Sequence, residues 1–269
     1  MKIRSKRSLI VLICIGSCLV IGALIAWYTF WRPAKNTPDT QVQSISETSE
    51  SVEEPGTSNS IKLPGAEPIA ALEGDYTQDD SLWRLVNKSH PLSDIDYRPK
   101  LIKPNVATRS DKSLDEQSVR EDIAPAVEEL FADAKTAGHD LEIGSGFRSA
   151  ELQNTYYSNY VSVYGQEAAD AVSAKPGYSE HQTGLAIDIS TVDRNCYLED
   201  CFGETPAGIW LRDNAHQYGF ILRYPLEKEG ITDFRYESWH FRYVGKDLAN
   251  ALYQSGLSLD EAAPYLEQR

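Results

Sequence analysis

Basic residues are scarce over most of this sequence. Six of its 26 lysines and arginines precede Asp39, the first acidic residue, so residues 36–269 hold the other 20 bases against all 40 acids, a formal charge of −20. A polypeptide segment with this excess of acidic residues repels nucleic acid and anionic lipid. The shortage of positive charge therefore argues against a function on a phosphate backbone.

Internal repeats are absent, and long hydrophobic runs are absent with one exception. The composition, 41% hydrophobic and 25% charged, is ordinary for a globular protein. It excludes collagen, a fully disordered chain and a transporter with many membrane spans. The length of 269 residues allows one or two domains.

The exception is residues 8–31, which are 24 positions without a charged side chain and are long enough to span a bilayer as a helix. Four basic residues precede this run, so we expect residues 1–7 to be a cytoplasmic basic segment. Trp27, Tyr28 and Trp31 lie where an outer interfacial belt is expected. The sequence thus predicts a single-pass transmembrane anchor in the cell membrane, with the rest of the chain extracellular.

Two other interpretations of this run stay open. A cleaved signal peptide has a shorter apolar core, of about 7–15 residues, and a small-residue cleavage site. Ile15–Cys18 is loosely similar to a bacterial lipoprotein signal, but residues 19–31 remain apolar where a lipoprotein turns polar. The length of the run favours the uncleaved anchor.

Residues 32–65 are predicted to form a disordered linker, and residues 66–269 a folded domain. Positions 36–65 are rich in Thr, Ser, Glu, Pro and Gln and lack aromatic residues, so they cannot bury enough apolar surface to fold. Such a tether reaches about 30 Å on average. The roughly 200 residues that follow suffice for one hydrophobic core. We therefore expect one domain, held near a membrane surface.

The spacing of apolar residues in this domain indicates a mixture of helices and short strands. Helices are expected over 115–137, after Ser149, and over 166–174, 208–218, 246–255 and 259–266. Pro125 lies inside the first pattern, so that helix is either kinked or starts later. Strands are expected at 141–146, 185–189, 220–224, 234–236 and 240–244. Because the strands are short and alternate irregularly with helices, we predict an α+β fold with a small, mostly antiparallel central sheet and flanking helices.

Two of the four cysteines, Cys196 and Cys201, lie close together in the predicted extracellular domain. Outside the cell such a pair usually oxidises, so we expect a disulfide that pins a surface loop. Two free thiols are the alternative, and a zinc site is less favoured because no second pair of ligands matches it. Cys14 and Cys18 lie in the hydrophobic run and are interpreted as packing residues.

Two of the five histidines lie in settings that indicate a metal site. His181 precedes Asp188 by seven residues, and a carboxylate within the apolar run around Asp188 is costly unless it is paired or bound to a metal. His240 follows Glu237 by three residues. Two histidines and one carboxylate leave a zinc ion an open position for water, which then loses its proton more easily. Glu237 is placed to take that proton and pass it to a leaving amine.

Three motifs together are more specific than any of these residues alone. The pattern S-x-H-x-x-G-x-A-x-D occupies 179–188, E-x-W-H occupies 237–240, and S-G-[FY]-R-S occupies 145–149. On these motifs the sequence resembles the bacterial VanY-type zinc D-alanyl-D-alanine carboxypeptidases, whose fold is shared with hedgehog-type domains and with related L,D-carboxypeptidases. The resemblance covers about residues 83–266.

The resemblance implies a role for each residue of the motifs. It implies one Zn²⁺ held by His181, Asp188 and His240, with Glu237 as the general base. It also implies that Arg148 contacts the substrate near the scissile carbonyl, where a guanidinium stabilises an oxyanion; a structural salt bridge is the alternative role. The remaining residues implied to contact the substrate are Gln153 and Ser179, at the peptide's terminal groups, and Trp239, as a wall of the site. The alternative for Gln153 is an ordinary polar residue on the face of a helix. The alternative for Ser179 is a residue that caps a loop.

The function implied is that of a membrane-anchored zinc metallocarboxypeptidase. It removes the C-terminal D-alanine from peptidoglycan stem pentapeptides, with its domain facing the cell wall. An L,D-carboxypeptidase that trims tetrapeptides to tripeptides uses the same machinery and remains an alternative. An endopeptidase is less favoured, because a phage lysin has no reason for a membrane anchor. A non-catalytic peptidoglycan-binding domain is disfavoured by the intact set of Glu237 and three ligands.

Overall fold

The computed structural model describes residues 65–266, except 71, 73 and 75. The predicted anchor at residues 8–31 and the predicted linker up to residue 64 lie outside the described residues. Within the described part of the chain, no helix is both long and apolar enough to cross a membrane.

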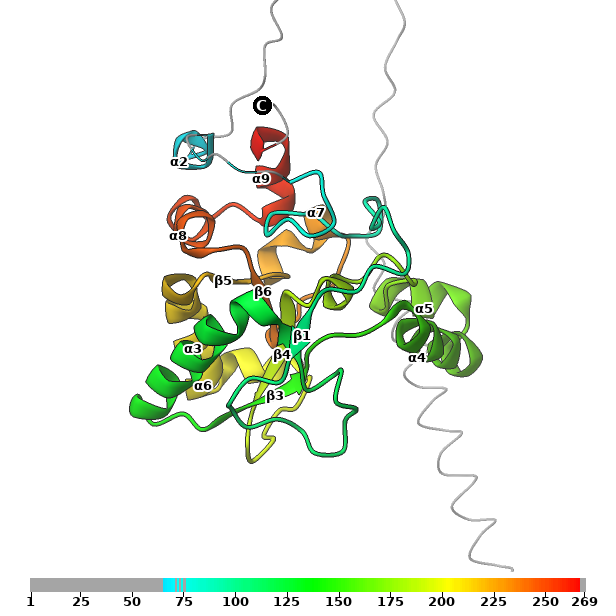
Figure 1. Cartoon of the computed structure of the whole chain (residues 1–269), viewed down its shortest axis with the longest axis horizontal. Helices are drawn as coiled ribbons and strands as arrows, with labels where there is room; N and C mark the ends of the chain where they lie inside the picture. Colours follow the sequence, from blue (N-terminus) through cyan, green and yellow to red (C-terminus); the bar gives the residue numbers. More distant parts are fainter. Residues whose placement is uncertain (1–64, 71, 73, 75, 267–269) are drawn as a thin grey trace, which may run out of the picture. The chain divides into compact units, whose positions relative to one another are not determined.

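A four-stranded antiparallel sheet lies at the centre of the domain (Figure 1). Its strands run in the order β3-β4-β6-β5, and every neighbouring pair is antiparallel, as the α+β prediction requires. The strands of this sheet are β3 (Leu141–Ser145), β4 (Ala186–Thr191), β5 (Phe220–Leu222) and β6 (His240–Tyr243). A separate pair is formed by β1 (Leu101–Ile102) and β2 (Val119–Arg120).

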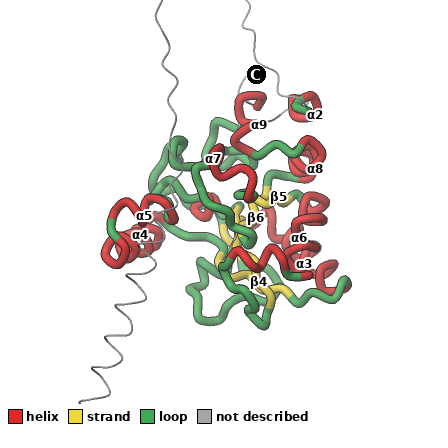
Figure 2. The backbone as a smooth tube through the Cα atoms, turned by 180° about the vertical axis from the view of Figure 1, so that it is seen from behind, coloured by secondary structure: helices red, strands yellow, loops and turns green. Residues whose placement is uncertain are grey.

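Helices flank the sheet on opposite sides, as Figures 1 and 2 show from front and back. On one side lie α3 (Ala124–Thr136) and α6 (Pro206–Asn214), and on the other α4 (Ala150–Tyr164) and α5 (Gln166–Val172). The remaining α-helices are α2 (Glu67–Ala70), α7 (Glu229–Thr232), α8 (Lys246–Ser255) and α9 (Leu259–Leu266). The 3-10 helices are η1 (Glu121–Ile123), η2 (Glu180–Thr183), η3 (Asp200–Glu204), η4 (Ala215–Tyr218) and η5 (Leu226–Lys228).

The two faces of the sheet differ in chemistry because side chains alternate along each strand. Ile187 and Ile189 of β4 and Phe241 of β6 belong to the main hydrophobic core, together with Leu130 of α3 and Leu211 of α6. The side chains between them, Asp188, His240 and Arg242, are polar and also buried. One face of the sheet therefore packs on α3 and α6, while the opposite face carries charged groups. A second core joins α2, α8 and α9.

Local signals explain most of the element boundaries. α4 begins directly after Ser149, whose hydroxyl accepts a hydrogen bond from the Leu152 amide, a regular N-cap. Gly219 adopts a left-handed conformation at φ 89° and ends the helical segment before β5. Both boundaries follow the sequence prediction.

The later start left open for the first helix is confirmed, and one predicted strand was wrong. α3 begins at Ala124 rather than at 115, because Pro125 is accommodated in the first turn of a helix but not in its interior. Residues 119–120 instead form strand β2. No strand forms at 234–236, where the Tyr236 amide donates to the side chain of Glu229 rather than to a neighbouring strand.

Gly146, directly after β3, has no space for a side chain. A Cβ atom at this position would lie 2.2 Å from the carbonyl oxygen of Ser118, which is backbone and cannot rotate away. We expect Gly146→Ala to lower the free energy of unfolding by about 1–3 kcal/mol, in the range of overpacked sites. Urea unfolding of both proteins checks this. Gly230→Ala is the matched control, since nothing lies within 4 Å of its added methyl group; equal losses in the two variants would contradict the assignment.

Candidate metal and catalytic site

The register of the sheet brings the predicted ligands together. Asp188 of β4 lies directly opposite His240 of β6, and Ser145 of β3 lies opposite Asp188 on its other side. His181 lies in η2, the short turn that leads into β4. Gly184 ends this turn in the left-handed conformation, at φ 70°. A favourable glycine turn thus folds His181 back toward the strand that carries Asp188.

Three buried side chains converge with the geometry of a metal site. His181 Nε2 lies 3.4 Å from Asp188 Oδ2, and His240 Nδ1 lies 3.3 Å from Asp188 Oδ1. Each residue offers one ligand atom, and these three atoms all lie within 4.8 Å of one another. Burial acts to raise the pKa of Asp188, but His181 and His240 hold it below its ordinary value, so the carboxylate is ionised.

The donor set fits zinc. Asp188 Oδ1 is buried and has no hydrogen-bond partner among the described residues, so it needs a cation to compensate for burial. Two imidazoles and one carboxylate are the ligands of catalytic zinc sites with one open position. His181 Nδ1 lies 2.7 Å from the carbonyl oxygen of Gly146, which leaves Nε2 facing Asp188. A bond to the far ring nitrogen is the usual way to orient a metal-ligating histidine.

Glu237 lies beside this cluster. Its Oε2 is 3.7 Å from His240 Nδ1, the ring nitrogen that faces Asp188. A tight turn holds it there, because the amide of His240 donates to the Glu237 carbonyl and the amide of Glu237 donates to the Tyr224 carbonyl. Burial raises the pKa of Glu237 to about 7. A carboxyl with this pKa can both accept and release a proton near neutral pH.

Arg148 lies on the other side of Asp188, with Nη2 3.9 Å from Asp188 Oδ2. Its Nη1 donates to Gln153 Oε1 at 2.9 Å, and Gln153 Nε2 donates to the Ala174 carbonyl at 2.6 Å. Gln153 is 1% exposed and holds the guanidinium in place. The Arg148 side chain is 16% exposed and lines the cavity, so its guanidinium is accessible to a substrate oxygen there.

All the residues predicted for the site line one cavity of about 580 Å³. Ser179 and Trp239 are both almost fully buried in its wall. Sequence reasoning missed the tyrosines that line the same cavity, which are Tyr156, Tyr160, Tyr164, Tyr178, Tyr197 and Tyr224. The four-residue spacing of the first three, which places them on one face of α4, was the available signal.

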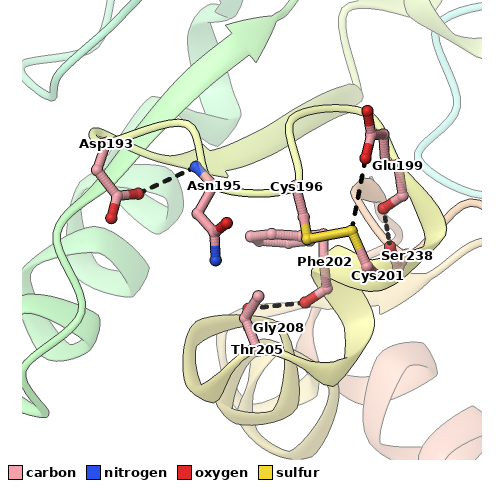
Figure 3. The surroundings of a disulfide bond; sticks show 9 residues. All are labelled: Asp193, Asn195, Cys196, Glu199, Cys201, Phe202, Thr205, Gly208 and Ser238. Carbon is pink, nitrogen blue, oxygen red and sulfur yellow. Dashed lines mark hydrogen bonds between the residues drawn. A yellow bond between two sulfur atoms is a disulfide. The ribbon is translucent and has the colours of Figure 1, made fainter.

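A disulfide between Cys196 and Cys201 closes a short loop (Figure 3). Tyr197 and Leu198, which lie between the two cysteines, contribute to the cavity wall. Ser238, the neighbour of Glu237, donates its hydroxyl hydrogen to the carbonyl of Glu199 in the same loop, at 3.2 Å. The disulfide loop is therefore attached to the segment that carries Glu237.

Comparison with known proteins agrees with the geometry. The family model described as "VanY: D-alanyl-D-alanine carboxypeptidase" matches residues 116–246. The putative carboxypeptidase YodJ of Bacillus subtilis is 41% identical over 183 residues, which cover 68% of this chain and 67% of YodJ.

Two solved structures share the fold. The LdcB LD-carboxypeptidase is 39% identical, with a TM-score of 0.66, over 70% of this chain and 88% of LdcB. The D,D-pentapeptidase VanY of the VanB-type vancomycin resistance cassette, a mutant solved in complex with Zn(II), is 32% identical, with a TM-score of 0.57, over 68% of this chain and 99% of VanY.

Proposed function

From the premise that the chain belongs to the VanY family of D-alanyl-D-alanine carboxypeptidases, we propose that it removes the C-terminal D-alanine from peptidoglycan stem pentapeptides as a zinc enzyme. One observation carries the proposal. Asp188, His181 and His240 form a buried ligand set, and the carboxylate of Glu237 lies 3.7 Å from a ligand nitrogen. This arrangement suits the hydrolysis of a peptide bond.

The residues of the chain divide the reaction between them. His181, Asp188 and His240 hold the zinc ion, which supplies Lewis acidity when bound: it polarises the scissile carbonyl and makes water easier to deprotonate. Glu237 takes the proton of the attacking water and delivers it to the amine of the departing D-alanine. Arg148 donates to the carbonyl oxygen as negative charge develops on it, and Gln153 keeps the guanidinium in position.

L,D-carboxypeptidase activity, which trims tetrapeptides to tripeptides, is a second candidate. A specific observation favours it: the LdcB LD-carboxypeptidase matches this chain with 39% identity, against 32% for the D,D-pentapeptidase VanY. Both activities use the same catalytic groups. The residue accepted before the scissile bond distinguishes them.

The proposal includes a location. The uncharged run at residues 8–31 and the basic residues before it favour a single-pass anchor in the cell membrane. Residues 32–65 then serve as a linker to an extracellular domain. Newly inserted stem pentapeptides occur near the membrane, so an anchored domain would meet its substrate there.

The test uses the full-length chain purified in detergent and loaded with zinc. Pentapeptide and tetrapeptide muropeptides are incubated with it separately, and mass spectrometry identifies the products, with a chelator-treated sample as control. Loss of one alanine from the pentapeptide alone supports D,D-carboxypeptidase activity. Trimming of the tetrapeptide alone assigns L,D-specificity. No cleavage of either peptide by folded, zinc-loaded protein overturns the carboxypeptidase proposal.

The disulfide loop provides a separate prediction about substrate binding. The double variant C196S/C201S is expected to lose about 2 kcal/mol of stability, the contribution of a short closed loop. We also expect KM to rise several-fold with a smaller change in kcat, because Tyr197 and Leu198 form part of the cavity wall. Urea unfolding and steady-state kinetics measure the two effects. The double variant C14S/C18S is the control, and a KM unchanged in C196S/C201S would contradict the role of the loop in binding.

A further inference from the structure

Four charged residues that contact one another in the interior take no direct part in the proposed reaction. Glu180, Arg223 and Arg242 have fully buried side chains, and the side chain of Asp260 is 8% exposed. They come from η2, from the residue after β5, from β6 and from α9, segments that are far apart in the sequence. Burying four charges is costly, and replacing such a group by apolar residues is often neutral or stabilising. Fold stability alone is therefore a weak reason for this network.

The network converges on one carboxylate. Glu180 Oε1 accepts a hydrogen bond from Arg223 Nε at 2.7 Å and another from Arg242 Nη1 at 2.9 Å. Its second oxygen, Oε2, is buried and lies 3.5 Å from Nε2 of His240. Neither of these two atoms has a hydrogen bond to any of the described residues. The two arginines thus bind one oxygen of Glu180, and the other oxygen is directed at a metal ligand.

The two arginines are themselves held from outside the site. Arg223 donates to the carboxylate of Asp260 through both amino nitrogens, and Asn87 Nδ2 donates to the same carboxylate at 2.9 Å. Arg242 Nη2 donates to the backbone carbonyls of Leu82 and Arg84, at 3.1 and 2.8 Å. Both guanidinium groups are thus anchored by partners other than Glu180, which restricts the position of the Glu180 carboxylate.

The two ligand imidazoles are thus oriented by different groups. The far nitrogen of His181 faces a neutral backbone carbonyl, that of Gly146, whereas the far nitrogen of His240 faces the carboxylate of Glu180. A carboxylate behind a ligand histidine fixes the tautomer and the ring orientation and makes the nitrogen that binds the metal more basic. The cost of burying Glu180 is explained if it acts on His240 in this way.

We propose that Glu180 is a positioning residue for His240, and that Arg223, Arg242 and Asp260 hold Glu180 against that ring, which makes the C-terminal helix α9 part of the support of the metal site. The inference rests on the proposed zinc site. It concerns how tightly zinc is held, so it is tested without substrate.

Zinc affinity is measured on the full-length chain purified in detergent, by competition with a chromophoric chelator. Glu180→Gln keeps the shape of the side chain and an acceptor oxygen but removes the charge. We expect it to bind zinc about 10- to 100-fold more weakly, the usual effect of losing such a partner. The visible spectrum of the Co(II)-loaded variant is expected to shift as well, because the orientation of His240 changes.

Glu142→Gln is the matched control. Glu142 is also buried and paired with an arginine, Arg194, at 2.7 Å, but it contacts none of the three metal ligands. We expect this variant to bind zinc within about twofold of the wild type, since its partner lies outside the ligand support. Equal losses of zinc affinity in Glu142→Gln and Glu180→Gln would overturn the proposal, because a general loss of stability would then explain both.

Asp260→Asn keeps the test decisive if Glu180→Gln does not fold. This variant leaves Glu180 intact and loosens only Arg223, so zinc binding is expected to weaken less than in Glu180→Gln, by under about tenfold. Wild-type affinity in every folded variant of the network overturns the positioning role while leaving the proposed function standing. A wild-type chain that binds no zinc overturns the zinc site itself, and this inference with it.

Discussion

Glu237→Gln is expected to lower kcat for removal of D-alanine by about 10²- to 10⁴-fold, the usual contribution of a general acid–base residue. Glutamine has the same shape as glutamate but cannot take a proton from water at neutral pH. The zinc ligands are untouched, so the variant is expected to bind zinc as tightly as the wild type. Steady-state kinetics on the stem pentapeptide, with zinc content measured on the same samples, separates the two effects.

Glu227→Gln is the control for this substitution. Glu227 lies in η5, is exposed, and is not among the residues that line the catalytic cavity. Its replacement is expected to leave kcat unchanged. Near wild-type turnover by a zinc-loaded Glu237→Gln protein would show that another group moves the proton, and the mechanism would have to be reassigned.

Asp188→Asn is expected to weaken zinc binding by more than about 100-fold, since even residues that merely support metal ligands cost 10- to 100-fold. It removes the anionic donor of the set, the carboxylate that lies 3.3 Å from His240 and 3.4 Å from His181. Hydrolysis is expected to fall in proportion to the zinc lost, and to recover in part when zinc is added in excess.

Asp188→Asn is also expected to make the thermal stability of the protein nearly independent of zinc. At zinc concentrations about a thousandfold above Kd, binding adds about 4 kcal/mol to the stability of the wild type. Chelation should therefore lower the Tm of the wild type markedly and that of Asp188→Asn hardly at all. Asp213→Asn, at an exposed pair with Arg212, is the control and should respond to chelation like the wild type. An equal response of Asp188→Asn would exclude Asp188 as a ligand.

The candidate site could be predicted from the sequence as a list of residues but not as a geometry. The spacing between His181 and Asp188 indicates a turn and a strand, yet only the register of β4 against β6 places Asp188 opposite His240. Spacing within a segment reports local structure. Pairing between distant strands depends on packing of the whole core, which the pattern does not encode.

Residues that act through others were missed for the same reason. Glu180 occupies a variable position of the S-x-H motif, and its partners Arg223 and Asp260 are distant in the sequence. Each looks like an ordinary surface charge until the structure shows it buried. Apolar spacing alone does not locate the start of the first long helix, because it continues back through β2. Pro125 does, since it requires a position in the first turn, which is the later start that the sequence left open.

The pairing of β4 with β6 also determines when a metal site can exist during folding. Roughly fifty residues of chain separate these two strands. Closing a loop of this length costs conformational entropy before the strands can form stabilising contacts. Pairing between such distant strands is therefore slow. The ligand set is not preformed in the unfolded chain, so its affinity for metal is coupled to folding. We therefore expect zinc capture to come late in the maturation of this protein, so that a rise in bound metal over time measures completed folding rather than the presence of the motif.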